Sequence, residues 1–315
     1  MAYVVDPVAE FNEFLKVFDH PDNEFLKHTV IEEFTCPRNI VREFIMSKHG
    51  EGCSIATLRS YFITIRSFLK DNSQQAIADI DSAAIKYWLL DYQATHHLSN
   101  SSLDNLRRYL NSFYNYLLAE EYLIKNPMLA VHRIKSDKIL RMPFTEEDLE
   151  HIRDACESSR ELALVDFLYS TGVRVSECSR ADISDFNFQN LEGHVYGKGG
   201  KERLVYLDTR AKIHLQRYLG FRRDNNSALF VRPVSPYERM TKSQIEHVIK
   251  QIGDRAGVEN CHPHRFRRTL ATRLLERGMP IEQVQMILGH EKLDTTLIYA
   301  KVNQTSIKLN HSKFA

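Results

Sequence analysis

Six side chains in the second half of the chain are of the types that act on phosphate esters. Arginine offers paired N–H donors to phosphate oxygens, histidine exchanges protons near neutral pH, and a tyrosine phenol is a nucleophile once it has lost its proton. The six residues are Arg174, Lys198, His264, Arg267, His290 and Tyr299. Each alone has an ordinary structural explanation, such as an ion pair, a helix cap or a packed ring, so the inference rests on their joint occurrence.

Their local contexts exclude two other kinds of site. Lys198 lies in Gly-Lys-Gly-Gly-Lys, a glycine-rich tip that lacks the G-x-x-x-x-G-K-[ST] pattern of a nucleotide-binding P-loop. His262, His264 and His290 could be considered as zinc ligands, but the chain has no H-E-x-x-H motif and no nearby Cys or Asp at ligand spacing. His264 and Arg267 are three residues apart, which puts them on one face of a helix.

In this order and spacing, the motifs closely resemble those of the tyrosine recombinases, the family of Xer recombinases and phage-type integrases. They are T-G-V-R-V-S-E with Arg174, G-K-G-G-K-E-R-L-V with Lys198, H-R-F-R with His264 and Arg267, L-G-H with His290, and T-L-I-Y with Tyr299. The resemblance covers roughly residues 40–310, and the spacings are similar to those of the bacterial Xer branch. His262 and Arg268 depart from the commoner family pattern.

The chemistry of a phosphodiester explains why these residue types are needed. The phosphodiester is an anion that resists attack, so a catalyst must neutralise its charge, activate the nucleophile and protonate the leaving group. The planar forks of Arg174 and Arg267 suit them to clamp the scissile phosphate. The Tyr299 phenol has an unperturbed pKa near ~10 and needs help to lose its proton, and His264 is suited to that general-base task.

The resemblance implies the remaining roles. Lys198 would protonate the departing 5′-hydroxyl, His290 would donate a hydrogen bond to the phosphate, and Glu177 would support the first arginine or the histidine without touching the reacting atoms. The implied reaction is a reversible transesterification, in which Tyr299 forms a 3′-phosphotyrosyl link to DNA and the 5′-hydroxyl of a partner strand later attacks that link. Such a reaction requires neither a metal nor a nucleotide cofactor.

The resemblance also implies the partners. They are double-stranded DNA with a specific recombination site and, on that DNA, a homotetramer or a heterotetramer with a second recombinase, in which the tail at 301–315 contacts a neighbouring protomer. The biological role is then either Xer-type chromosome dimer resolution or the integration and excision of a mobile element. Two alternatives are a DNA-binding or regulatory protein on the same scaffold without turnover, which the presence of all six residues disfavours, and a type IB topoisomerase, which the Xer-like spacings disfavour.

Periodic apolar residues predict a small helical unit in the first half of the chain. From Ser54 to about Lys70 they recur in steps of three and four, with Ser54 as the N-cap. Further helices are expected after Asp81 and from about Ser101. We expect the last of these to end at Asn126, because a residue that precedes proline is pushed out of the α region.

The second half is predicted to be mostly helical with one hairpin. Thr145 followed by three acidic residues has the form of a helix start, with Phe144 and Leu149 as a hydrophobic staple. The β-rich runs at 194–196 and 203–206 flank the glycine-rich tip and predict a hairpin. Helical patterns resume at about 242–252, 264–277 and 280–288.

The predicted fold class is therefore mainly α with a small β element. The resemblance implies an N-terminal helical core-binding domain of the SAM-like type and a C-terminal tyrosine-recombinase catalytic domain of the α+β type. The boundaries we expect are an acidic N-terminal extension at 1–33, a helical core-DNA-binding domain at 34–131, a linker at 132–143, a catalytic domain at 144–300 and the tail at 301–315.

Charge is unevenly distributed along the chain. The 315 residues include 42 Lys and Arg against 41 Asp and Glu, a formal net charge of +1, which is low for a protein that binds DNA phosphates. Residues 1–33 hold two basic and eight acidic residues, so the remainder carries the basic excess. We expect this acidic stretch to be a solvated helical segment, with a docking surface for a partner as the alternative.

The sequence predicts a cytoplasmic protein without a membrane partner. No stretch approaches the ~20 consecutive apolar residues of a membrane helix, and the N-terminus lacks the basic start and apolar core of a signal peptide. The five scattered cysteines include no C-x-x-C pair, so reduced thiols are expected.

Overall fold

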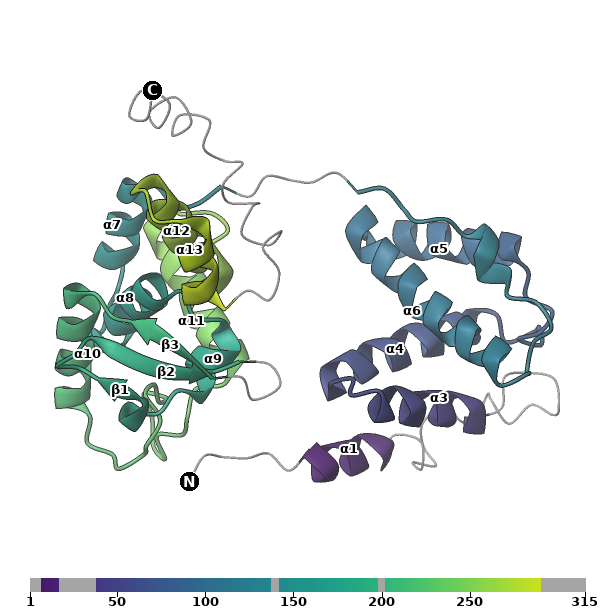
Figure 1. Cartoon of the computed structure of the whole chain (residues 1–315), viewed down its shortest axis with the longest axis horizontal. Coiled ribbons are helices and arrows are strands. Elements are labelled where there is room, and N and C mark those ends of the chain that lie inside the picture. The colour runs from purple at the N-terminus through teal and green to yellow at the C-terminus, as the bar shows by residue number, and fades with distance from the viewer. Residues whose placement is uncertain (1–6, 17–37, 137–141, 198–201, 290–315) are drawn as a thin grey trace. The chain divides into compact units, whose positions relative to one another are not determined.

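The computed structural model of the chain describes residues 7–16, 38–136, 142–197 and 202–289 (Figure 1). The chain divides into two compact units, Met1–Lys138 and Ile139–Ala315, and the division falls within the segment at 132–143 that the sequence predicts as a linker. The described residues are mostly helical with one small sheet, so the predicted fold class is confirmed. None of the helices within these ranges is long and apolar enough to cross a membrane.

The N-terminal unit is helical, and its three predicted helices are confirmed. The described elements are α1 (Pro7–Leu15), α3 (Arg38–Gly50), α4 (Ile55–Asp71), α5 (Ser82–His96), α6 (Asn100–Ala119) and the 3-10 helix η2 (Pro127–Ala130). Ser54, Asp81 and Ser99 cap α4, α5 and α6 by accepting a backbone N–H of the first turn. These caps satisfy donors that a helix N-terminus otherwise leaves unpaired.

One predicted helix end is wrong. We expected the third helix to continue to Asn126, whereas α6 ends at Ala119. The Asn126 side chain instead accepts the N–H of Met128 and caps the short helix η2, in which Pro127 takes the first position. The Asn-Pro pair therefore starts an element here, because proline fits a first helical turn as well as it follows a helix.

The N-terminal unit has an aromatic core. Phe44 of α3 is fully buried, and its ring contacts those of Tyr61, Phe113 and Tyr116 at centroid distances of 5.3, 5.2 and 5.4 Å. All three pairs are edge-to-face, the arrangement that the ring quadrupoles favour. Helices α3, α4 and α6 are joined through this cluster.

Helix α1 belongs to this core, although it lies within the stretch that we expected to be a solvated extension. Phe11 and Phe14 are 8% and 5% exposed. The Phe11 ring stacks on His49 at 3.7 Å, and the Phe14 ring meets Phe62 edge-on at 6.1 Å. The two phenylalanines lie three residues apart, on a single face of the helix. This apolar spacing indicates a packed face, which the interpretation of 1–33 from its charges alone overlooked.

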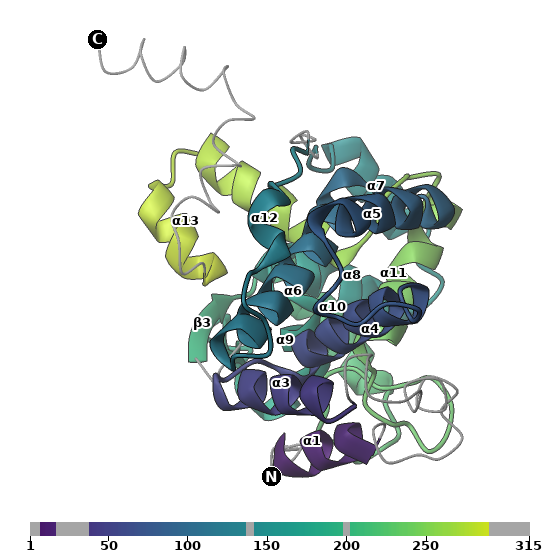
Figure 2. The same cartoon turned by 90° about the vertical axis from the view of Figure 1, so that its right-hand side faces the viewer.

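The C-terminal unit surrounds α8 with other helices. Its described elements are α7 (Glu146–Asp154), α8 (Ser159–Thr171), α9 (Val175–Arg180), η3 (Ile183–Asp185), β1 (Phe186–Asn187), β2 (Glu192–Tyr196), β3 (Glu202–Tyr206), α10 (Thr209–Phe221), α11 (Lys242–Ala256), α12 (Pro263–Glu276) and α13 (Ile281–Leu288). Helix α8 packs against α10, α12 and α11, and α12 lies beside α13 in both views (Figures 1 and 2).

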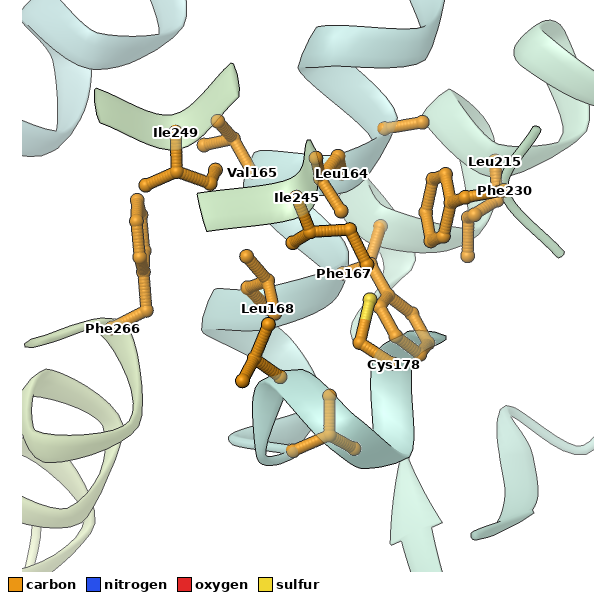
Figure 3. Close-up of a cluster of buried hydrophobic side chains, with 14 of the residues drawn as sticks. Leu164, Val165, Phe167, Leu168, Cys178, Leu215, Phe230, Ile245, Ile249 and Phe266 are labelled. Atoms are coloured by element: carbon orange, nitrogen blue, oxygen red, sulfur yellow. The ribbon is translucent and has the colours of Figure 1, made fainter. Parts of the chain in front are cut away.

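The core of this unit fixes the first turn of α12. Figure 3 shows Leu168 of α8, Ile245 and Ile249 of α11, and Phe266 of α12 directed into one cluster of apolar side chains. All four are fully buried. Because Phe266 stands between His264 and Arg267 in sequence, its burial sets the rotation of the helix that presents both residues.

The predicted hairpin is confirmed, and a third short strand was missed. Strands β2 and β3 pair antiparallel with His194 opposite Leu204 and Val195 opposite Arg203. Strand β1 pairs with the other edge of β2, so the sheet order is β1-β2-β3. The tip at 198–201, including Lys198, lies outside the described residues.

The predicted helix starts in this unit hold to within one residue. Thr145 and Asp148 form a reciprocal capping box at the start of α7, and the staple residues Phe144 and Leu149 are both buried. Pro263 occupies the first turn of α12. Pro280 is the N-cap of α13 rather than its first residue.

The packing of α1 predicts a measurable contribution to the stability of the N-terminal unit. Phe14→Ala should lower the free energy of unfolding by about 3 kcal/mol, because it removes a buried ring and leaves a cavity. The chain has one tryptophan, Trp88, which is buried in this unit, so urea unfolding followed by its fluorescence reports on this unit. Asn12→Ala on the exposed side of α1 is the control, and equal midpoints for the two variants would contradict the assignment.

Candidate active site

Four of the seven predicted site residues lie in the described part of the chain. Arg174 and Glu177 lie at the start of α9, and His264 and Arg267 lie in the first turn of α12. The other three, Lys198, His290 and Tyr299, lie outside the described residues, as does the tail at 301–315. Their roles stay predictions.

A tight turn at Gly172 delivers Arg174 to the site. Helix α8 ends at Thr171, and Gly172 adopts a left-handed conformation with φ of +59°. A Cβ atom at this position would lie 2.8 Å from Leu270 Cδ2 and 3.1 Å from Leu288 Cδ2. Glycine is therefore required both by the backbone angle and by the close approach of α12 and α13.

Glu177 is buried, and its carboxylate binds both the side chain and the backbone N–H of Arg174. Its side chain has no exposed surface, and its Oε1 accepts a hydrogen bond from Arg174 Nη1 at 2.9 Å. Its Oε2 accepts the backbone N–H of Arg174 at 2.8 Å and Arg203 Nη2 at 2.7 Å. Burial by itself raises the pKa of Glu177, but Arg203 and Arg174 together outweigh it and lower that pKa below its usual value. The carboxylate is therefore ionised at neutral pH.

Arg267 is buried and joins the ends of two helices. It is 3% exposed, and its guanidinium donates through Nη1 to the Gly172 carbonyl at 2.6 Å and through Nη2 to the Leu288 carbonyl. Both acceptors belong to the C-terminal ends of helices, where carbonyls lack partners within the helix. Such ends also carry partial negative charge, which favours a cation.

The two predicted clamp arginines converge at the end of α13. Arg174 donates through Nη2 to the carbonyl of Gly289 at 3.0 Å, and Arg267 donates to the carbonyl of the preceding residue, Leu288. The structure thus brings together Arg174, Arg267 and Glu177 around the start of α9 and the end of α13. The Arg174 side chain is 36% exposed, so it faces solvent while Arg267 does not.

His264 is exposed at the start of α12, in a positively charged environment. Partial desolvation lowers the pKa of its imidazole, and the nearby charges of Arg267 and Arg174 lower it further, whereas Glu246 of α11 acts in the opposite direction. The ring lines a cavity of about 760 Å³ between α11 and the N-terminal end of α12. A neutral imidazole in this position can accept a proton.

Among the described residues, no group of three or more His, Cys, Asp or Glu side chains could hold a metal ion. The rings of His262 and His264 lie 6.5 Å apart between centroids. His262 also lines the cavity beside His264.

Arg203 joins the site, although the sequence analysis assigned it no role. It lies on β3 and donates to Glu177 and to the Ile287 carbonyl of α13. A signal was present in the sequence, because side chains alternate along a strand and Arg203 therefore lies on the same face as Val205, which is fully buried. An arginine on the buried face of a strand requires an acidic partner.

Two family models match the chain. One describes the phage integrase family and matches residues 128–306, and the other describes the N-terminal SAM-like domain of phage integrases and matches residues 40–124. The first covers more than half of the chain and all six predicted catalytic positions. The chain belongs to the phage integrase family of tyrosine recombinases.

Relatives in the Xer branch are similar along most of the chain. The tyrosine recombinase XerC of Staphylococcus aureus is 31% identical over 265 residues, which cover 80% of this chain and 88% of the relative. The XerC of Oceanobacillus iheyensis is 29% identical over 280 residues, covering 85% and 92%. The XerA of Pyrococcus horikoshii is 30% identical over 274 residues, covering 86% and 91%.

Solved structures agree with the fold. A crystal structure of XerA recombinase is 25% identical with a TM-score of 0.51 and covers 87% of this chain and 98% of its own. The integrase of the Tn1549 transposon, in complex with a circular intermediate DNA, has a TM-score of 0.72 and covers 90% of this chain and 100% of its own. At 19% identity, the second likeness concerns the fold alone.

The charge environment of His264 predicts its titration. Its NMR midpoint, assigned by loss of the signal in His264→Gln, should lie below 6.5, the ordinary value for the group. Arg174→Gln should raise the midpoint, because it removes one of the nearby positive charges. In the wild-type protein, the pKa of His264 is lower in the folded chain than in the unfolded chain. Between these two pKa values the unfolded chain binds more protons, so His264 adds stability as pH rises through that window. A midpoint at or above 6.5 would contradict the assigned environment.

Proposed function

We propose that this tyrosine recombinase cuts and rejoins DNA at a specific site through a covalent link between Tyr299 and a 3′-phosphate. The protein is a site-specific DNA recombinase by its family and its Xer relatives, and the silent regulatory alternative is not favoured. The observation that supports the covalent mechanism is the convergence of Arg174 and Arg267 on the adjacent carbonyls of Gly289 and Leu288. His290 follows directly in sequence, and Tyr299 is nine residues further on.

The first half of the reaction forms one bond and breaks one. The Tyr299 oxygen attacks the phosphorus as its proton passes to His264, and the bond from phosphorus to the 5′-oxygen breaks as Lys198 donates a proton to that oxygen. Arg174 and Arg267 neutralise the charge that develops on the non-bridging oxygens, and His290 donates a hydrogen bond to one of them. The neutral imidazole implied by the lowered pKa of His264 supports its role as proton acceptor.

The second half reverses these steps with a different strand. A 5′-hydroxyl of the partner duplex attacks the phosphorus of the phosphotyrosyl link as its proton passes to Lys198, and Tyr299 leaves with a proton returned from His264. Because the phosphotyrosyl link conserves the phosphodiester, rejoining needs no nucleotide and no metal.

The proposal includes an assembly on DNA. Exchange between two duplexes needs four active sites, so we place a homotetramer, or a heterotetramer with a second recombinase, on double-stranded DNA, with the tail at 301–315 joining protomers. Relatives named XerA, XerC and XerD favour Xer-type exchange over the role of a mobile-element integrase. The proposal also includes a cytoplasmic location, where the DNA substrate would be met.

A covalent-capture experiment tests the nucleophile. Nicked duplexes with a randomised core are incubated with the full chain, and DNA that stays attached after denaturation is recovered and sequenced, which also identifies the site. Wild type should form the adduct and Tyr299→Phe should form none, because only the phenol oxygen can attack. Tyr237→Phe is the control, since Tyr237 lines a cavity with the first residues of α8, at the opposite end of this helix from the turn to Arg174. An adduct that persists in Tyr299→Phe would exclude Tyr299 as the nucleophile.

Replacement of the exposed clamp arginine separates cleavage from binding. With the captured duplex as probe, Arg174→Lys should slow adduct formation about 100-fold and leave the dissociation constant nearly unchanged, because lysine keeps the charge but loses the planar fork. Gel shifts measure binding, and single-turnover adduct formation measures cleavage. An equal loss in both would show that Arg174 is architectural.

A further inference from the structure

Arg203 lies where three elements of the catalytic unit meet. Its side chain is 11% exposed, and Nη2 donates to Glu177 Oε2 of α9 at 2.7 Å. Nη1 donates to the carbonyl of Ile287 in the last turn of α13. Arg203 itself lies on β3, five residues after Lys198 in sequence. One guanidinium therefore links the hairpin strand to both elements that bind Arg174.

Gly289 makes this contact possible. A Cβ atom at Gly289 would lie 2.5 Å from Arg203 Cδ and 3.0 Å from Arg203 Nε. Gly289 has a φ of +61°, and its carbonyl accepts the hydrogen bond of Arg174. The Arg203 side chain thus lies flat against the backbone that leads to His290.

We propose that Arg203 is a positioning residue for strand cleavage, which orients Arg174 and the end of α13 toward the scissile phosphate. This inference rests on the proposed function. Arg203 occupies Glu177 Oε2, so Arg174 binds Oε1 with Nη1 and keeps Nη2 for the Gly289 carbonyl. Without Arg203, the buried carboxylate can take both terminal nitrogens of Arg174, since two parallel bonds are the preferred geometry of an arginine–carboxylate pair. Arg174 would then turn away from the phosphate.

The contacts require an arginine rather than any cation. Nη1 and Nη2 bind acceptors on two different helices at once, which a lysine ammonium on its flexible stem cannot do with the same geometry. The Nε atom is buried and has no hydrogen-bond partner among the residues that the structure describes. An unpartnered buried donor is unfavourable, so the side chain gains nothing from Nε in this position. The hydrogen bonds of its two terminal nitrogens therefore determine where it lies.

The test uses the full chain and the duplex captured by wild type. Under single turnover with saturating protein, Arg203→Met should slow adduct formation about 10- to 100-fold, because a small displacement of a clamp residue is enough for such a loss. The dissociation constant for the duplex should change little. Arg203→Lys should recover only part of the rate. Equal rates for Arg203→Met and wild type would overturn the inference while leaving the proposed function intact, whereas failure of wild type to capture any duplex would overturn the proposed function.

A matched variant distinguishes positioning from stability. Arg255→Met removes a comparable ion pair in the same unit, that between Arg255 and Glu161 of α8. It should lower the melting temperature similarly and change the rate less than about threefold. A rate loss in Arg255→Met as large as that in Arg203→Met would show a general effect of stability and overturn the inference.

Duplexes with a modified phosphate give a rate ratio that a mere loss of stability in Arg203→Met would not change. A methylphosphonate at the scissile position lacks the negative charge that Arg174 compensates in a phosphodiester, so the ratio of wild-type to Arg203→Met rates should shrink on this duplex. A duplex with a sulfur at the bridging 5′ position, whose leaving group needs no proton, should keep the ratio unchanged. The reverse pattern would show that Arg203 acts on the leaving group and not on the clamp.

The glycine contact supplies a test in which Arg203 itself is present. Gly289→Ala introduces the clash with Arg203, whereas Gly257→Ala carries the same left-handed strain at the end of α11, where a Cβ atom meets nothing within 4 Å. Gly289→Ala should slow adduct formation far more than Gly257→Ala. If Arg203→Met fails to fold, the comparison of Gly289→Ala with Gly257→Ala still tests the inference. Equal rate losses in these two variants would overturn it.

Discussion

The repulsion between three arginine side chains is the constraint on which the catalytic unit depends. Arg174, Arg203 and Arg267 meet near the end of α13, and Glu177 is the carboxylate that two of them share. Backbone carbonyls at Gly172, Ile287, Leu288 and Gly289 accept further hydrogen bonds from the three guanidinium groups. These carbonyls lie at helix C-terminal ends, where they are unpaired within the helix and partly negative, so they hold cations without adding a full charge that would compete with phosphate.

This arrangement explains the local backbone. Helices α8 and α13 both present a terminal carbonyl to the guanidinium of Arg267, and both end in a left-handed glycine, Gly172 and Gly289, with side chains packed close against it. Partial desolvation and, after it, the charges of Arg267 and Arg174 lower the pKa of His264. Phe266, the residue before Arg267, fixes α12 to the apolar core shown in Figure 3. The charge cluster and the core therefore both hold the first turn of α12, through Arg267 and Phe266.

Features encoded locally could be predicted from the sequence, and those that depend on distant contacts could not. The caps at Ser54 and Thr145 and the hairpin follow from neighbouring residues, so they were predicted correctly. The burial of Phe11 depends on His49, and the contacts of Arg203 depend on Glu177, 26 residues away in sequence. The grouping of Arg174 with Arg267 was predicted only because the motif resembles a family whose members share it.

The different exposure of the two clamp arginines separates their roles in the proposed reaction. Arg267 is buried between two carbonyls, so its position is already set before DNA binds. Arg174 reaches solvent, and its contact with the Gly289 carbonyl is the one that an incoming phosphate oxygen can most readily replace. Such a replacement would release the backbone immediately before His290. Phosphate binding would then act on the end of α13 through a single hydrogen bond, with Arg203 holding the preceding turn of α13 in place.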